Sequence, residues 1–178
     1  GFDLPRLFCG SFGTLGLVAE VVFRLHPLPE ASATALFEGL SAADVQETLP
    51  VLGELAVEPT AVTALAGGAA GTFTLAIRFE GFAPGVRDQV DRTLARAGGG
   101  ARLEGAEEEA LWSRHDAMRA AGNVRARATF APAALVPALE ALRPVHGALS
   151  AAAIALHPAL GIALLAGDLA DAAAAAQA

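Results

Sequence analysis

The chain has 178 residues, of which 54% are hydrophobic and 17% charged, so it can bury a core and is unlike a disordered chain. Its formal net charge is −7 and its 12 basic residues are scattered arginines, which argues against a nucleic-acid-binding surface, since that needs clustered cations. The single cysteine, Cys9, excludes an internal disulfide and a zinc-binding spacing, so a reducing compartment, the cytoplasm, is expected.

The first part of the chain predicts a short helix, a loop and a strand. Asp3 and Pro5 are typical of a helix start, with Leu4, Leu7 and Phe8 turned inward. A glycine-rich loop follows at residues 10–16, and residues 17–25 are apolar and β-branched enough to predict a well-buried strand. Prolines 27 and 29 stiffen the chain and remove backbone donors, which predicts a domain boundary near residue 30.

Residues 31–104 predict a ferredoxin-like unit. Ser41 begins a helix that runs to about Leu55, and Phe73, Leu75, Ile77 and Phe79 alternate as in a strand with one buried face. The expected order is strand 33–39, helix 42–55, strand 61–65, strand 72–80, helix 84–97 and strand 101–104.

The rest of the chain predicts a helix at 107–121 and a second strand–helix–strand group packed against the first, with strands at 124–130, 149–156 and 161–165 and a helix at 132–142. Residues 148–166 are long and apolar enough to raise the question of a membrane span. Because His157, Pro158 and Gly161 interrupt them, two buried strands joined by a turn are expected instead. An alanine-rich helix is expected at the end. The N-terminus shows no signal peptide, and both ends are expected to be cut.

The first 29 residues, GFDLPRLFCGSFGTLGLVAEVVFRLHPLP, carry a family resemblance. Gly1, Phe2, Asp3 and Leu4, and then Gly10, Ser11, Gly13, Thr14, Leu15 and Gly16, are similar to the segment that closes the FAD-binding domain of the vanillyl-alcohol-oxidase-like (PCMH-type) flavoproteins. The resemblance implies an α+β chain in which residues 1–30 end that domain and residues 31–178 form a ferredoxin-like cap with an antiparallel sheet. It also implies contacts to FAD, mostly through backbone atoms, from Phe12, Gly13, Thr14, Leu15, Gly16, Leu17 and Val18.

Two departures narrow the resemblance. Phe12 stands where the family usually has glutamate, and the late region HGALSAAAIALHPALGIALLAG has only His146 and His157 in place of a histidine- and glycine-rich metal-binding motif. No metal site is therefore expected. The helix ALWSRHDAMR is similar to a helix of these caps. Together these features resemble the accessory FAD-binding (E) subunit of glycolate oxidase complexes.

That subfamily implies oxidation of a small 2-hydroxy acid such as glycolate. It implies catalytic flavoprotein and iron–sulfur subunits as partners, no direct membrane insertion, and a cytoplasmic location or attachment at the inner membrane through those subunits. The chain by itself is expected to be inactive, because most of the FAD domain is absent. Two alternatives stay open: another FAD-linked enzyme, such as a D-lactate dehydrogenase or an alkyl-glycerone-phosphate synthase, and a non-catalytic subunit that docks partners.

The histidines do not identify a general base, so the catalytic residue stays unknown. His26, His146 and His157 flank prolines or apolar strands and are interpreted as turn residues, whereas His115 between Arg114 and Asp116 is interpreted as part of a solvated helix face.

Three other features have structural interpretations. Trp112 is predicted to anchor the core, and Cys9 to pack as a small apolar residue. Arg125 and Arg127 share one face of a strand and are expected to form surface ion pairs.

Overall fold

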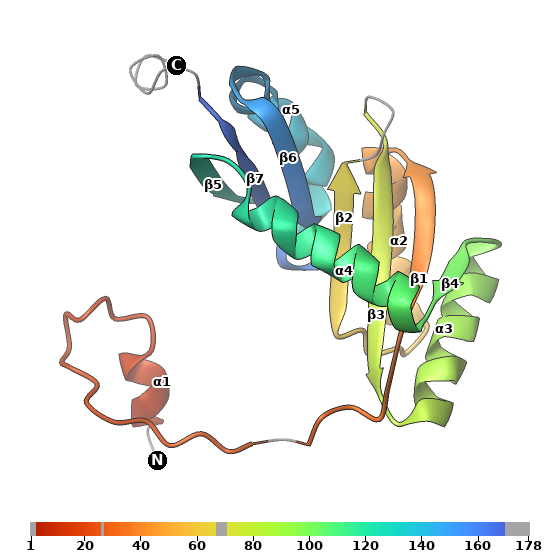
Figure 1. The fold of residues 1–178 in the computed structure, drawn as a ribbon, viewed down its shortest axis with the longest axis horizontal. Coiled ribbons are helices and arrows are strands. Elements are labelled where there is room, and N and C mark those ends of the chain that lie inside the picture. Colours follow the sequence, from red (N-terminus) through yellow and green to blue (C-terminus); the bar gives the residue numbers. More distant parts are fainter. Residues whose placement is uncertain (1–2, 26, 67–70, 170–178) are drawn as a thin grey trace.

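The computed structural model describes residues 3–25, 27–66 and 71–169 (Figure 1). These residues form seven strands, five α-helices and two short 3₁₀ helices. In chain order the elements are α1 (Leu4–Phe8), β1 (Ala31–Leu40), α2 (Ala42–Glu54), β2 (Ala61–Ala66), β3 (Phe73–Gly81), α3 (Ala83–Ala97), β4 (Ala101–Leu103), α4 (Gly105–Ala120), β5 (Val124–Thr129), η1 (Pro132–Ala134), α5 (Leu135–Ala148), β6 (Ser150–His157), η2 (Pro158–Leu160) and β7 (Ile162–Asp168).

The seven strands form one sheet in the order β4-β1-β3-β2-β6-β7-β5, and neighbouring strands are antiparallel throughout. The order β4-β1-β3-β2 with α2 and α3 confirms the ferredoxin-like α+β prediction. The prediction that the second group packs against the first was wrong. The second group extends the same sheet edge to edge, because β6 pairs with β2 through Ala64, Leu65 and their partners Leu156 and Ala155.

One face of the sheet carries the main core. The alternating side chains of β3 point there, and Phe73, Leu75, Ile77 and Phe79 are all buried as expected. The helices α2, α3 and α5 cover this face with buried side chains, among them Val45, Val90 and Leu135. Packing of these helices on the strands removes apolar area from water, which is the dominant stabilising term in folding.

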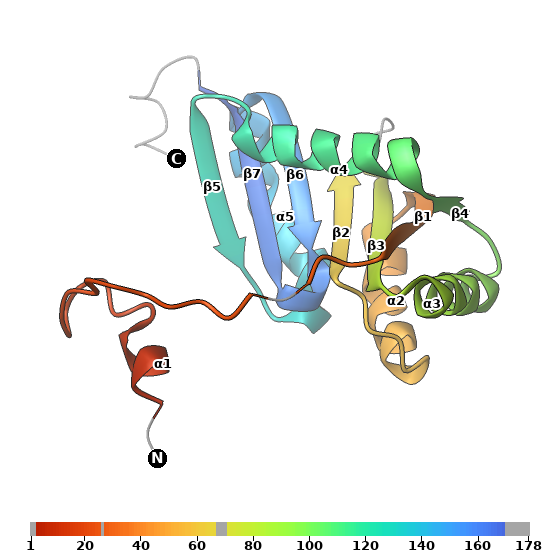
Figure 2. The same cartoon turned by 60° about the horizontal axis from the view of Figure 1, so that its bottom comes forward.

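The opposite face of the sheet is covered by α4 (Figure 2). Leu111 of α4 packs with Leu65, Ala76 and Ala155 of the sheet, and Trp112 adds to this smaller cluster, which confirms its interpretation as a packing residue. Because α4 crosses the strands at an angle, it leaves part of β5, β6 and β7 uncovered (Figure 2).

The interrupted apolar stretch forms two strands, as expected from its proline and glycine. β6 and β7 pair from His157 and Ile162 onward, and η2 joins them. Gly161 closes this turn at φ 62°, and a Cβ there would overlap the Phe130 carbonyl oxygen. Within the described residues, no helix is long and apolar enough to cross a membrane. The expected alanine-rich terminal helix lies outside the described residues.

Residues 3–25 and 27–30 form an arm that lies away from the sheet (Figures 1 and 2). The helix start is confirmed, since Asp3 accepts a hydrogen bond from the Arg6 backbone N–H. The inward side chains were wrongly predicted: Leu4, Leu7 and Phe8 are exposed, and so is Cys9. An amphipathic helix this short buries an apolar face only against a neighbouring element.

The predicted strand at 17–25 does not form in the arm. Leu17 is 93% exposed and Phe23 is 78% exposed, and the sheet contains no strand from this segment. The pattern was read correctly as apolar, but a strand also requires a partner for its backbone N–H and C=O groups. His26, Gly1 and Phe2 lie outside the described residues.

Candidate functional site

An open cleft of about 610 Å³ lies where α4 leaves the sheet uncovered. Small side chains, Ala153, Ala155 and Ala166, line it from β6 and β7, with Leu164 beside them. The last turns of α4 and the exposed face of β5 line its sides through Asp116, Met118, Arg119, Arg125 and Arg127. This volume is typical of a small-molecule site.

The cleft is cationic, although the chain as a whole is acidic. Arg119, Arg125 and Arg127 line it, and Asp116 is the carboxylate among its lining residues. The expected surface ion pairs of Arg125 and Arg127 do not form with any described carboxylate. Arg125 instead donates a hydrogen bond to the Ala120 carbonyl oxygen at 3.4 Å, at the end of α4. Guanidinium groups recognise carboxylates through paired N–H donors, so the cleft is suited to a small anion.

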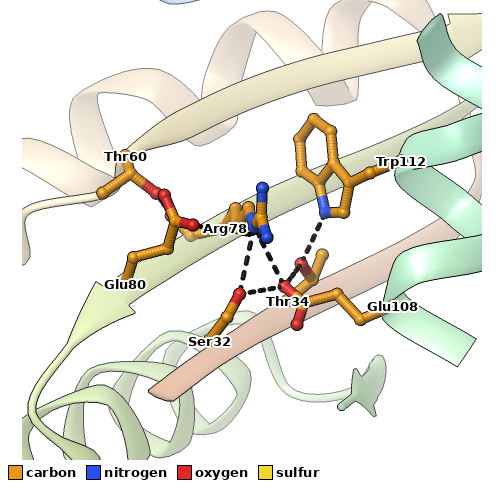
Figure 3. Close-up of polar contacts among 7 residues, drawn as sticks. All are labelled: Ser32, Thr34, Thr60, Arg78, Glu80, Glu108 and Trp112. Atoms are coloured by element: carbon orange, nitrogen blue, oxygen red, sulfur yellow. Dashed lines mark hydrogen bonds and ion pairs between the residues drawn. The ribbon is translucent and has the colours of Figure 1, made fainter. Parts of the chain in front are cut away.

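A buried polar network fixes α4 on the sheet beside this cleft (Figure 3). Glu108 of α4 is 4% exposed, and its Oε1 accepts hydrogen bonds from Ser32 Oγ at 2.7 Å and Thr34 Oγ1 at 2.8 Å. Arg78 Nε of β3 lies 3.2 Å from the same oxygen. These partners offset the cost of burying a carboxylate.

Trp112 extends the network by one helical turn. Its Nε1–H donates to Thr34 Oγ1 at 3.0 Å, and the Arg78 guanidinium lies over its ring at 5.4 Å from the centroid. Arg78 also pairs with Glu80 at 3.3 Å. The network therefore sets the rotation and register of α4, which carries part of the cleft wall.

The sequence interpretation missed this network, although a signal was present. Ser32 and Thr34 alternate with the buried Ala33 and Ala35, so β1 presents a polar stripe to the α4 face. Glu108 lies in the first turn of α4, where acidic residues are favoured by the helix dipole in any case, so its position in the sequence does not indicate burial.

His115 and His146 are placed differently from their interpretation. His115 was expected on a solvated face, but it is 4% exposed and its ring meets that of His157 at a centroid distance of 5.6 Å. The interpretation failed because α4 turns this side of the helix toward the sheet. His157 ends β6, as a turn residue would, and His146 lies in the last turn of α5.

The glycine loop predicted to contact a cofactor lies in the arm, apart from the cleft (Figure 1). Phe12 has φ 51° and is 99% exposed, and Gly13 has φ 78°. A Cβ built on Gly10 or Gly13 would meet nothing within 4 Å. The loop thus presents open backbone, which close approach of a dinucleotide requires, and the contacts of its residues to FAD stay a prediction.

No group of three or more His, Cys, Asp or Glu side chains in the described part of the chain is placed to hold a metal ion. That no metal is bound stays a prediction from the sequence.

Comparisons with known proteins identify relatives over parts of the chain. The chain is 33% identical over 144 residues to a probable mitochondrial D-lactate dehydrogenase of Danio rerio, which is 70% of this chain and 29% of that protein. It is 53% identical over 45 residues to glycolate oxidase subunit GlcD of Bacillus subtilis, which is 24% of this chain and 10% of that protein. It is 47% identical over 36 residues to a mitochondrial D-lactate dehydrogenase (cytochrome) of Arabidopsis thaliana, which is 20% of this chain and 6% of that protein.

Over these stretches the chain is homologous to FAD-linked oxidoreductases of the vanillyl-alcohol-oxidase superfamily. The resemblance to this superfamily is confirmed, and the finer resemblance to the accessory (E) subunit stays a prediction. No protein-family model matches the chain. This FAD-linked oxidoreductase homologue spans less than a third of the length of each of these relatives.

Proposed function

We propose that the chain is part of an FAD-linked oxidoreductase of the glycolate oxidase type, which oxidises a small 2-hydroxy acid such as glycolate. The observation that carries the proposal is the arginine-lined cleft. Arg119, Arg125 and Arg127 bind the carboxylate of the substrate there, and the alanine floor leaves room for its short carbon chain. The relatives are named for glycolate and D-lactate, both of which are 2-hydroxy acids.

The arm supplies the second part of the site. Residues 12–18 contact FAD mostly through backbone atoms, while residues 31–178 form the substrate-side cap. The flavin, when bound, accepts the electrons that the hydroxy acid loses. The chain's own contribution is to hold the substrate and the cofactor loop in place. We also propose that other glycolate oxidase subunits are partners of this chain and that it is cytoplasmic.

A second function, docking of partner subunits without turnover, is favoured by the arm. Leu17, Val22, Phe23, Leu25 and Leu28 are all largely exposed. A run of exposed apolar side chains of this kind is typical of a surface that another protein element covers. An accessory subunit that binds FAD could carry out this function as well.

The first experiment is the visible spectrum of the purified parent protein, expressed from its complete open reading frame. We expect flavin bands that Gly13→Trp abolishes. Gly71→Trp is the matched control, since Gly71 also has a left-handed φ of 81° and open space around its Cβ. A colourless, folded parent protein, or flavin bands unaffected by Gly13→Trp, would contradict the assignment of FAD to this loop.

The second experiment measures steady-state kinetics of the assembled enzyme with glycolate and D-lactate. Arg127→Ala removes a charged donor from the cleft, so we expect KM to rise tenfold or more, equivalent to about 1.4 kcal/mol. Arg87→Ala, an exposed arginine of α3 on the other face of the sheet, is expected to leave KM unchanged. If the two variants have equal KM values, the cleft is not the substrate site, and docking of partner subunits is the better account.

A further inference from the structure

Two imidazoles join α4 to the sheet next to the arginine-lined cleft. His115 is 4% exposed, and its ring lies edge to face with Trp112 at 5.4 Å and with His157 at 5.6 Å between centroids. His157 is the last residue of β6. The pair therefore lies between the second half of α4 and the end of a strand that forms the cleft floor.

The hydrogen bond of His115 indicates which ring nitrogen is the donor. Its Nδ1 lies 3.0 Å from Asp116 Oδ1, and because a carboxylate only accepts, Nδ1 carries the proton. The other nitrogen, Nε2, is buried and has no hydrogen-bond partner among the described residues. Nε2 is thus a buried polar atom without a partner in the described part of the chain, so the His115 ring is held by packing on this side and by the Asp116 hydrogen bond on the other.

The surroundings of His157 disfavour a positive charge on its ring. Burial is the largest influence that lowers the pKa of His157, followed by His115 and by the Arg119 guanidinium, and a hydrogen bond with the Val62 backbone acts in the opposite direction. Asp116 is the carboxylate in contact with the pair, and its side chain is 73% exposed. The charged groups on the elements around the pair are Glu107, Glu108, Glu109, Arg114, Asp116 and Arg119 of α4, Arg78 and Glu80 of β3, Arg125 and Arg127 of β5 and Asp168 of β7.

We propose that His115 and His157 are positioning residues of the cleft: while His157 is neutral, the packed pair holds the second half of α4 on β6, and protonation of His157 releases it. The released segment carries Asp116, Met118 and Arg119, which line one side of the cleft. Glu108 lies two helical turns earlier and keeps the first half of α4 on β1 and β3. Acid thus opens one end of the helix while the other stays docked.

The sign of the pH dependence follows from His157. Its pKa in the folded chain is lower than in the unfolded chain, where it is about 6.5. The unfolded state therefore binds more protons between those two values, and the free energy of unfolding falls as the pH drops from about 6.5 to the lowered pKa. Above about pH 7 both states are neutral at this position and the effect is absent.

Amide hydrogen exchange of the full chain tests the proposal without any ligand. After correction for intrinsic rates, we expect exchange in residues 111–120 to rise at least threefold between pH 7.5 and 5.5, while residues 83–97 of α3 change less than twofold. Equal responses of the two helices would overturn the proposal. This measurement needs no variant, so it remains decisive if a substitution at the buried His115 prevents folding.

Trp112 provides a second measurement, because it is the only tryptophan of the chain and contacts His115. We expect its fluorescence to change with a midpoint below pH 6.5, His157→Gln to remove at least half of that change, and His146→Gln, in α5, to leave it intact. A His157→Gln chain that titrates like the parent chain would overturn the proposal.

The effect on the cleft rests on the proposed function and is tested separately by titrating the chain with sodium glycolate against sodium chloride of equal ionic strength. Displacing Arg119 removes one of three guanidinium groups, so we expect glycolate affinity to fall at least threefold between pH 7.5 and 5.5. If α4 responds to pH but glycolate binds at neither pH, the positioning pair is supported and the proposed substrate is refuted. If glycolate binds equally at both and α4 does not respond, the proposed substrate is supported and the pair is refuted.

Discussion

At the scale of single residues, Glu108 links α4 to the sheet outside the apolar core. It is a buried carboxylate whose three donors come from β1 and β3, so it joins α4 to two strands that are distant in sequence. Its neighbour in the network, Glu80, also pairs with Arg78, but its side chain is 28% exposed. The two acidic residues thus share one arginine in different environments.

Because Glu108 is buried and Glu80 is partly exposed, we expect their substitution to lower the free energy of unfolding by unequal amounts. Glu108→Ala leaves Ser32, Thr34 and Arg78 without their acceptor, so we expect the free energy of unfolding to fall by about 2 kcal/mol or more. Glu80→Ala breaks a more exposed ion pair, and we expect a loss below about 1 kcal/mol. Urea unfolding of both variants is the measurement, and equal losses would show that Glu108 does not hold α4.

At the scale of elements, the turn that joins β6 and β7 shapes the floor of the cleft. Gly161 has a left-handed φ of 62°, and the Phe130 carbonyl lies where a side chain would begin. That carbonyl belongs to the residue after β5, and the Phe130 backbone N–H donates to the Gly161 carbonyl at 2.8 Å. The turn therefore ties three neighbouring segments together.

Gly161→Ala is expected to lower the free energy of unfolding by about 2 kcal/mol, because it adds backbone strain and a steric overlap. Gly147→Ala is the control: Gly147 lies in α5 with nothing within 4 Å of a built Cβ, so we expect a neutral effect or a gain of up to about 0.5 kcal/mol. Thermal and urea unfolding measure both. A Gly161→Ala chain as stable as the parent would mean that the turn relaxes without cost.

At the scale of the whole molecule, the arm and the sheet differ in how far their apolar side chains are buried. The buried side chains all come from residues 33–166, whereas the apolar residues of the arm are exposed. No described residue of the arm is buried in the core, and the division of the arm from the cap as a separate domain near residue 30 stays a prediction.

A chain that begins at Glu30 is therefore expected to unfold at the same urea midpoint as the full chain, within about 0.3 M, and to self-associate less. Urea unfolding and sedimentation at several concentrations test this. A markedly lower midpoint would show that the arm packs on the sheet.

The sequence by itself determined the order of elements in the cap. Hydrophobic alternation in β3, the Ser41 cap of α2 and the glycines after α3 are local signals, and local backbone preferences with one buried face are enough to specify a strand or a helix. The motifs of the first 29 residues were also enough to indicate the superfamily that the relatives confirm.

Only the tertiary structure decided which strands are neighbours and which polar residues meet. Glu108 and Thr34 are 74 positions apart, and the β2–β6 pairing that makes one sheet of the two groups is equally non-local. His115 is buried and Arg127 faces a cleft because of the angle at which α4 crosses the sheet. That angle depends on packing between distant segments, which no local pattern encodes.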